Sequence, residues 1–381
     1  MSIINPVTPA PSGVPTTPKS PQAQMNGILQ SFHPGWFGAV MGTAIVGVAA
    51  ALNPGHIAAL QPTMRMVSVV MTALAYLLAL ALGIPYVARW IRHLTAAWRD
   101  LQHPVLGALY ATFPAGLLVL ATTTAAVGPG ILPPHTIWLV VAILTAVGGA
   151  LALVISVLFA YILFVAPSVP VEMANGGWFI PPVVAIIVPL ATLPLLPGVD
   201  APTERLLLLI GYAAWGMGFL LFLLIAALLY SRQVHHALPA APLAPSLWIG
   251  LGPIGVGSLA LIRLAPATAH LWGVELVPVI SAVSTLSAAM LGGFGVWWLA
   301  TAVLLLIRYR REGPLPYAVG WWAFTFPLGA YTVSTLALGR AWQVGALEGL
   351  GAALFLLLVG FWLVVTTFTL IHLRTGLAWK R

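Results

Sequence analysis

The stretch HPGWFGAVMGTAIVGVAA, residues 33–50, opens the first long apolar run of the chain and begins with a proline and a glycine. Most of its other residues are small. Small residues let the backbones of membrane helices approach closely, and proline kinks a helix because it removes a backbone hydrogen bond. Within a membrane, such a break is tolerated where neighbouring helices or water satisfy the freed backbone group. The stretch is therefore typical of a membrane helix that is surrounded by other helices.

The composition of the whole chain is that of a helical membrane protein. Of its 381 residues, 61% are hydrophobic and 6% are charged, whereas a soluble domain contains about 25% charged residues. The apolar runs repeatedly approach the ~20 residues that a helix needs to span the hydrocarbon core. Cysteine is absent, which excludes disulfides, thiolate catalysis, zinc–thiolate sites and iron–sulfur ligation. We expect no cofactor and no metal.

Ten apolar segments predict an all-α integral membrane protein with ten transmembrane helices. The predicted spans are 34–52, 66–88, 104–127, 137–165, 177–196, 206–230, 247–263, 276–307, 318–338 and 346–372. Proline, serine and threonine in residues 1–31 predict a disordered cytoplasmic tail. Residues 32–373 are expected to form the transmembrane domain, and residues 374–381 a short basic cytoplasmic tail.

The net charge of +8 is explained by membrane topology, because the cations lie in short segments between apolar runs. On one side of the ten spans lie Lys19, Arg89, Arg92, Arg99, Arg232, Arg308, Arg310, Arg311, Arg374, Lys380 and Arg381. On the other side lie only Arg65, Arg205, Arg263 and Arg340. The positive-inside rule then places both termini in the cytoplasm. We expect a multi-pass protein of the cell membrane that binds no nucleic acid.

The odd-numbered spans share a pattern of aromatic residues near a proline, followed by small residues. Their sequences include FHPGWFGAVMGT, YATFPAGLLVLATTT, GGWFIPPVVAIIVP, LWIGLGPIGVGS and WWAFTFPLGAYTVST. The prolines are Pro34, Pro114, Pro182, Pro253 and Pro327, at spacings of 80, 68, 71 and 74 residues. Even-numbered spans, such as GFLLFLLIAALLY, are bulky and mostly free of proline. A repeat at a fixed period indicates a repeated supersecondary unit, here a hairpin of one proline-bearing helix and one plain helix.

Five such hairpins predict a quasi-symmetric ring with the slender helices around a central pore and the bulky helices facing lipid. Residues expected to line or kink the pore are Pro34, Gly35, Thr43, Pro114, Pro182, Pro253, Ser258, Thr325, Pro327 and Thr332. Further hydroxyls on the odd spans are Thr112, Thr122, Thr192, Ser334 and Thr335. Because no acid lies near the centre of an odd span, this lumen disfavours cations, and broken helices direct partial positive charge toward anions. The alternative is that each hydroxyl bonds the backbone of its own helix.

The ninth span contains a cluster of four aromatic residues before Pro327. Trp321 and Trp322 are typical of the membrane interface. Phe324 and Phe326 are two residues apart and therefore lie on different helical faces. A phenylalanine that projects into a narrow lumen closes it by exclusion and dewetting, whereas spacing alone favours packing in the core.

At these residues the chain resembles the tellurite-resistance/dicarboxylate transporter family, which includes bacterial tellurite-resistance channel homologues, plant guard-cell slow anion channels, fungal malate permeases and fungal sulfite pumps. HPGWFGAVMGTAIVG resembles the first span of the family, WFIPPVVAIIVPLA the fifth and GWWAFTFPLGAYTVSTLALG the ninth. The first and last are closest to the malate and sulfite branch. The resemblance covers roughly residues 32–372. It implies ten helices in five hairpins around a central pore, a homotrimer, and a phenylalanine gate at Phe326, with Phe324 as the second choice.

The expected function is transport of small anions, either C4-dicarboxylates such as malate or sulfite and other inorganic anions, driven by a gradient or by the membrane potential. A proton-coupled dicarboxylate symporter is the alternative, and it needs a titratable group within the membrane. The available groups, His33, Glu275 and Glu348, all lie at span ends. An integral membrane enzyme is not expected, because His235 and His236 form a poor metal pair and no HExxH motif is present. The expected partners are small anions, the lipid bilayer and further copies of the chain.

Overall fold

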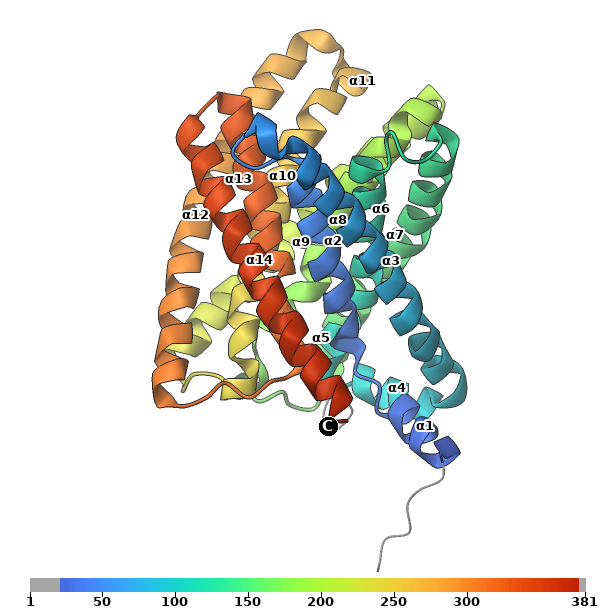
Figure 1. The fold of residues 1–381 in the computed structure, drawn as a ribbon, viewed down its shortest axis with the longest axis vertical. Helices are drawn as coiled ribbons and strands as arrows, with labels where there is room; N and C mark the ends of the chain where they lie inside the picture. Colours follow the sequence, from blue (N-terminus) through green and yellow to red (C-terminus); the bar gives the residue numbers. More distant parts are fainter. Residues whose placement is uncertain (1–20, 377–381) are drawn as a thin grey trace, which may run out of the picture.

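The computed structural model describes residues 21–376, and all the regular structure in this range is helical. Residues 1–20 of the predicted N-terminal tail and residues 377–381 of the C-terminal tail lie outside the described residues. Helix α1 (Pro21–Gln30) lies within the segment that the composition predicts to be disordered, and three residues separate it from the first span at Pro34. In Figure 1, α1 and the C-terminal end of α14 (Gly345–Arg374) lie at the same end of the molecule.

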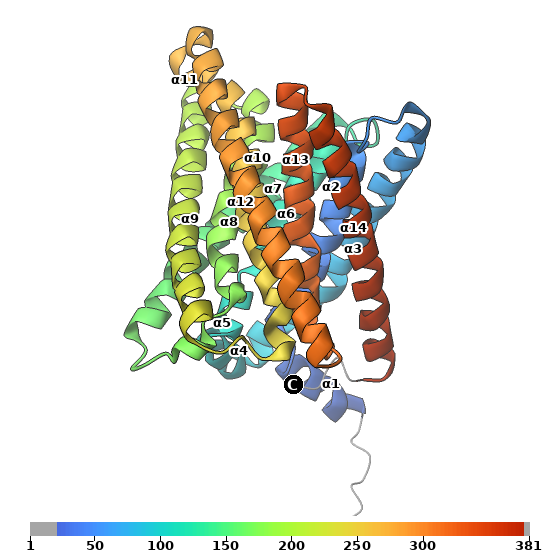
Figure 2. The same cartoon turned by 90° about the vertical axis from the view of Figure 1, so that its left-hand side faces the viewer.

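Five long helices form the periphery of the molecule, and we call them the outer helices. They are α3 (Gln61–Arg92), α7 (Pro134–Val165), α9 (Ala201–His235), α12 (Val277–Glu312) and α14. In the most apolar window of each, between 11% and 33% of the residues are buried. Figures 1 and 2 show these helices around the outside of the bundle.

Five shorter helices occupy the interior, and we call them the inner helices. They are α2 (Phe37–Ala51), α6 (Thr112–Val127), α8 (Ile180–Thr192), α10 (Leu251–Ala267) and α13 (Phe326–Trp342). Between 72% and 83% of the corresponding windows are buried in the first four, and 13 of the 17 residues of α13 are buried. Burial therefore divides the helices into the two sets that the alternation of slender and bulky segments predicts.

The inner helices contact one another in a closed order. Helix α2 packs on α6, α6 on α8, α8 on α10, α10 on α13, and α13 again on α2. Each inner helix also packs on the outer helix that follows it in the chain. Close approach explains some of the small residues: a Cβ atom on Gly255 of α10 would overlap the backbone of Ala330 and Tyr331 in α13. The ring is thus held by backbone proximity as well as by side-chain packing.

Short helices precede or follow the inner helices. The 3₁₀ helices η1 (Pro34–Trp36), η4 (Gly176–Phe179), η6 (Ala241–Gly250) and η8 (Val319–Phe324) lead into α2, α8, α10 and α13, and α5 (Leu106–Leu109) leads into α6. The remaining short elements are η2 (Ala58–Leu60), α4 (Leu94–Leu101), η3 (Val171–Met173), η5 (Leu193–Gly198), α11 (Ala269–Trp272) and η7 (Val274–Leu276).

The repeated prolines do not interrupt the middle of the inner α-helices. Pro114, Pro182 and Pro253 are each the third residue of an α-helix, Pro327 is the second residue of α13, and Pro34 begins η1. In the first turn of a helix the backbone N–H has no intrahelical partner, so proline loses nothing there. The prolines thus mark where a 3₁₀ segment changes to an α-helix, or where an α-helix begins.

By length and composition, nine helices among the described residues are able to cross a membrane, and the chain is a multi-pass membrane protein. Helix α13 is not among the nine. The predicted ninth span is divided at Thr325, which separates η8 from α13 and leaves a helix of 17 residues that contains Arg340. The predicted segment is helical on both sides of the break, but composition alone identifies one span fewer than the ten expected.

Candidate functional site

A cavity of about 260 Å³ lies where the inner helices begin, and we call it the N-terminal cavity. Every inner helix contributes at least one residue from its first two turns to its wall. Among them are Gly38 of α2, Thr112 of α6, Ile180 of α8, Gly252 of α10 and Pro327 of α13. The first N–H groups of all five inner helices therefore point toward this end of the ring.

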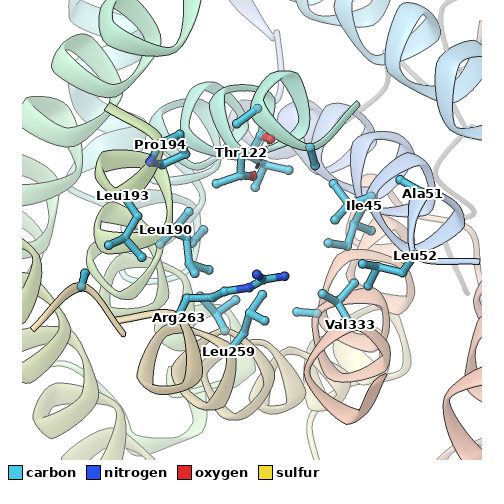
Figure 3. A pocket seen from close by; sticks show the side chains of 18 of the residues that line it. Ile45, Ala51, Leu52, Thr122, Leu190, Leu193, Pro194, Leu259, Arg263 and Val333 are labelled. Atoms are coloured by element: carbon cyan, nitrogen blue, oxygen red, sulfur yellow. Dashed lines mark hydrogen bonds between the residues drawn. The ribbon is translucent and has the colours of Figure 1, made fainter. Parts of the chain in front are cut away.

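A second cavity, of about 720 Å³, lies toward the other ends of the same helices, and we call it the C-terminal cavity. All five inner helices line it, for example with Val48, Thr122, Leu190, Leu259 and Val333. Figure 3 shows these helices as a ring around an open centre. The two cavities thus lie in series along the axis of the ring, because each helix lines one cavity near its start and the other beyond it.

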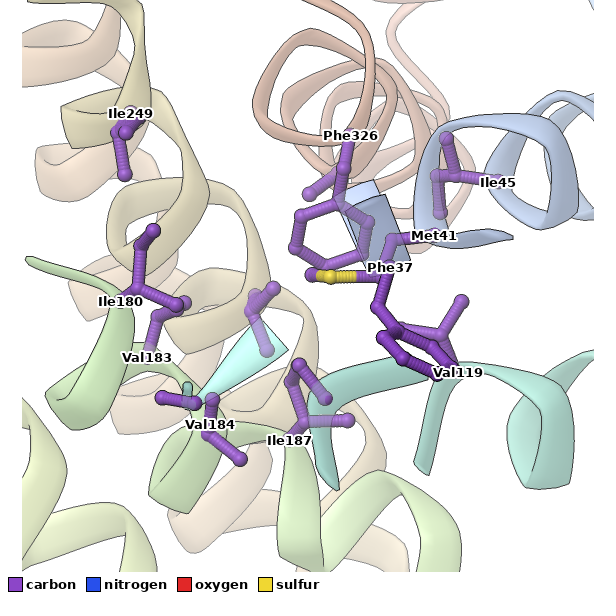
Figure 4. Packing of buried hydrophobic residues seen from close by; sticks show 14 of the residues in the cluster. Phe37, Met41, Ile45, Val119, Ile180, Val183, Val184, Ile187, Ile249 and Phe326 are labelled. Carbon is purple, nitrogen blue, oxygen red and sulfur yellow. The ribbon is translucent and has the colours of Figure 1, made fainter. Parts of the chain in front are cut away.

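Phe326 lies between the two cavities. Among the residues that the structure describes, it alone lines both of them. Figure 4 shows its side chain projecting from α13 toward the centre of the ring, beside Met41 of α2 and facing α8. It is the first residue of α13 and is 5% exposed. An apolar ring at this position separates the two cavities.

Phe324 points elsewhere, although it is only two residues away. Its ring stacks on Phe361 of the outer helix α14, with centroids 5.1 Å apart, and packs edge-on against Trp248. It lines neither cavity. The break in the helix at Thr325 directs the two side chains differently. Phe324 packs η8 against α14, whereas Phe326 faces the axis of the ring.

The structure brings only some of the predicted pore residues to the cavity walls. Gly35 and Pro327 line the N-terminal cavity together with Thr112, and Thr122 lines the C-terminal cavity. Pro34, Pro114, Pro182 and Pro253 lie in the helix starts behind the walls, and neither cavity has them in its lining.

Most of the predicted hydroxyls are engaged with their own helices. Ser258 donates to the carbonyl oxygen of Ile254 at 2.7 Å, Thr325 to that of Trp322 at 2.7 Å, and Thr332 to that of Leu328 at 2.8 Å. Thr192, Ser334 and Thr335 likewise donate to nearby carbonyls. Thr43 accepts a hydrogen bond of 3.0 Å from the indole of Trp362 in α14. None of these seven residues lines either cavity.

The N-terminal cavity contains polar groups that sequence analysis did not identify. The hydroxyl of Ser246 and the indole N–H of Trp322 are buried and have no hydrogen-bond partner among the described residues, and both residues line this cavity. Together with the starts of the inner helices, they provide donors and partial positive charge in a wall whose described residues include no acidic side chain. Such an arrangement suits a small anion. No sequence signal distinguishes Ser246 from the other serines.

The C-terminal cavity contains a charged residue, Arg263, which the sequence analysis interprets only as a signal of membrane topology. Arg263 of α10 lines this cavity, and Figure 3 shows its side chain pointing into the open centre. Val256 and Leu259 line the same cavity and precede Arg263 at the spacing of one helical face. This spacing is the sequence signal that could have predicted an arginine facing the axis.

The titratable groups weighed for proton coupling are separated by the fold. His33 lines the N-terminal cavity, and its Nδ1 atom accepts a hydrogen bond from the N–H of Gly35 at 3.1 Å. Glu348 instead pairs with Arg340, at 2.9 Å between Oε1 and Nη2, and Glu275 is exposed in η7. Neither glutamate lines a cavity. His236 faces Glu172 at 3.3 Å, and the described residues contain no cluster of three possible metal ligands.

Comparison with known proteins finds a matching family and several relatives. Residues 31–370 match the family model SLAC1, described as voltage-dependent anion channel. An uncharacterized transporter of Methanocaldococcus jannaschii is 34% identical over 354 residues, which cover 93% of this chain and 96% of the relative. A sulfite efflux pump of Arthroderma otae is 24% identical over 90% of each chain. The malic acid transport protein of Schizosaccharomyces pombe is 23% identical over 91% of this chain and 80% of the relative.

Proposed function

Because the chain belongs to the SLAC1 family of voltage-dependent anion channels, we propose that small anions cross the membrane along the axis of its inner ring, through both cavities and past Phe326. Membership confirms the resemblance found in the sequence, and it identifies the chain as a transport protein of a family of anion channels and transporters, not an enzyme. The observation that carries the proposed route is that Phe326 is shared by the two cavities.

The proposed route requires ten membrane crossings in five quasi-symmetric hairpins, with α13 as the ninth. A helix of 17 residues is about 25 Å long, and η8 extends it toward the membrane surface. An even number of crossings agrees with the position of α1 and the end of α14 at one end of the molecule. We place this end in the cytoplasm because most cations lie there. The family resemblance further suggests a homotrimer in the cell membrane.

The electrostatics of the route favour anions over cations. The starts of five helices surround the N-terminal cavity, and each carries roughly half a positive elementary charge. Among the described residues no acidic side chain lines either cavity, whereas cation pores commonly use acidic rings. The relatives named for sulfite and malic acid suggest sulfite or a C4-dicarboxylate as the transported anion.

Phe326 is the proposed gate. Its ring lies between two cavities whose walls are mainly apolar, and an apolar constriction excludes hydrated ions by dewetting. Opening requires the ring to leave the axis or the inner helices to separate. The cavities on either side are already formed by the same five helices, so the smallest change that joins them is a movement of this one side chain.

Replacement of Phe326 by alanine tests the gate. In proteoliposomes with a fixed membrane potential, Phe326→Ala should raise anion flux about tenfold or more, since each ~1.4 kcal/mol removed from a barrier gives a tenfold rate. Phe324→Ala is the matched control, because it removes the same kind of side chain two residues earlier in the sequence, where the ring packs on Phe361 and not at the axis. It should leave the flux per folded protein within about twofold. Equal fluxes of the Phe326 variant and the wild type, with both inserted, would exclude the gate.

Proton-coupled symport is the second candidate, and the position of His33 in the N-terminal cavity is the observation in its favour. Malate-driven acidification of the vesicle lumen at clamped voltage would establish coupling. We expect none, because the two glutamates near the spans, Glu275 and Glu348, lie outside the cavities.

A further inference from the structure

Arg263 occupies the axis-facing side of α10 in the C-terminal cavity. Val256, Leu259 and Arg263 follow one another at spacings of three and four residues, and all three line this cavity. Such residues form one face of a helix. Arg263 lies seven residues beyond Val256, which corresponds to about 10 Å along the helix. The guanidinium extends from this face into the open centre (Figure 3).

The Arg263 guanidinium has no hydrogen-bond or ion-pair partner among the residues that the structure describes. The side chain is exposed to the cavity. Two other arginines of the same end show the contrast: Arg340 is paired with Glu348, and Arg65 donates to the carbonyl oxygen of Pro129 at 2.5 Å. A cation that lines a cavity without a counter-charge has its five N–H donors available for a ligand.

The remaining wall of the cavity does not compete for an anion. Thr122 is the other polar side chain among the described lining residues, and its hydroxyl donates to the carbonyl oxygen of Val119 at 2.8 Å. The inner helices also end here, and each helix end carries roughly half a negative elementary charge. Without Arg263, this end of the route would repel anions.

We infer that Arg263 binds the transported anion in the C-terminal cavity, and that it selects oxyanions whose two oxygens match the planar guanidinium. Bidentate pairing of a guanidinium with a planar or pyramidal oxyanion is stronger and more directional than the attraction of a point charge. The inference rests on the proposed route, since the anion must reach this cavity. A carboxylate and a sulfite share the required pair of oxygens, whereas chloride does not.

Arg263→Gln and Arg263→Lys separate charge from geometry. In proteoliposomes, Arg263→Gln should lower sulfite and malate flux about tenfold or more, as expected for the loss of a hydrogen bond to a charged group. Arg263→Lys should retain chloride flux but lower the oxyanion flux relative to chloride by a factor of several. Arg205→Gln is the matched control, because Arg205 is exposed at the same end but lines neither cavity.

The absence of cysteine from the chain allows a second readout. Arg263→Cys has a single thiol, which a membrane-impermeant methanethiosulfonate converts to a cationic or an anionic side chain. The trimethylammonium reagent should restore chloride flux of the cysteine variant, and the sulfonate reagent should reduce it further. Both reagents should leave the cysteine-free wild type unchanged.

The outcomes distinguish the inference from the proposed function. A wild-type protein that conducts no anion would remove the route itself. A wild type that conducts, together with an Arg263→Gln variant indistinguishable from Arg205→Gln, would overturn the role of Arg263 and leave the route intact. Equal loss of chloride and oxyanion flux in Arg263→Lys would overturn the selection of oxyanions.

Discussion

The two cavities are built from opposite ends of the same five helices, yet they present different groups to an anion. The N-terminal cavity, of about 260 Å³, has helix starts and the uncharged donors of Ser246 and Trp322. The C-terminal cavity, of about 720 Å³, has a mainly apolar wall and one guanidinium. Parallel helices make this asymmetry unavoidable, because their dipoles favour anions at one end and disfavour them at the other. A formal charge is therefore needed only where the helices end.

The boundary between the cavities depends on close packing as well as on Phe326. On α10, Gly252 lines the N-terminal cavity and Val256 lines the C-terminal cavity, so the intervening Gly255 lies at the level of the boundary. Its contact with the backbone of α13 holds these two helices together where Phe326 begins α13. The comparison of the two cavities is thus testable at the boundary, at the C-terminal end and at the N-terminal end.

The largest effect on stability is expected at the boundary. Gly255→Ala places a methyl group against the backbone of Ala330 and Tyr331, and should lower the free energy of unfolding by roughly 3 kcal/mol, the upper range for overpacking. Thermal unfolding in detergent measures it. Gly257→Ala is the control on the same helix, since its added Cβ atom would lie 3.5 Å from the Phe219 ring, an ordinary contact. Similar melting temperatures for the two variants would show that α10 and α13 need not touch.

An intermediate effect on stability is expected at Arg340, which lies at the same end as Arg263 but is paired. Arg340 donates to Glu348 at 2.9 and 3.2 Å and to the carbonyl oxygen of Leu52 at 2.6 Å. Its replacement by glutamine should cost roughly 2 kcal/mol of stability, less than for a fully buried pair because Arg340 is 29% exposed.

Anion selectivity of Arg340→Gln should equal that of the wild type, whereas Arg263→Gln should alter selectivity and retain the wild-type melting temperature. Melting curves and reversal potentials in mixed chloride and malate measure the two properties on the same preparations. A shift of selectivity in the Arg340 variant would contradict the division between a structural and a ligand-binding arginine.

The smallest effect is expected in the N-terminal cavity. Ser246→Ala removes one uncharged donor, so anion flux at low concentration should fall by a factor of about five, which corresponds to ~1 kcal/mol. The melting temperature should not fall, because the lost hydroxyl has no partner among the described residues. Ser258→Ala is the control, since that hydroxyl is bonded to Ile254 and lines neither cavity. Identical concentration dependence in the two variants would exclude Ser246 from anion contact.

Much of the fold follows from residue patterns. The helical membrane class follows from 61% hydrophobic residues, and the division into inner and outer helices follows from the alternation of slender, proline-bearing segments with bulky ones. The nine helices identified as spans overlap nine of the ten predicted segments, and the outer helices are longer than predicted, as in Ala201–His235 against the predicted 206–230. The boundaries differ because a hydropathy window ends at the first polar residues, whereas the helices continue through these residues beyond the hydrocarbon region.

The candidate site was less accessible to prediction. Spacing left Phe324 and Phe326 as alternatives, and the break at Thr325 decides how each is directed. The hydroxyl of Thr332 is one helical turn from Leu328, so it donates to the carbonyl of its own helix. Hydropathy ends the seventh span at Arg263 and makes this residue a topology signal, but α10 continues to Ala267 and carries Arg263 into the cavity wall.

The sequence by itself determined that this chain is a bundle of membrane helices with a slender set and a bulky set, because lipid and close helix packing select different residues at every turn. Only the tertiary structure decided which face of each slender helix lies toward the axis, and with it the positions of Phe326, Ser246 and Arg263. The physical reason is that helical spacing relates residues within one helix, whereas the direction of the axis depends on four other helices that pack against it.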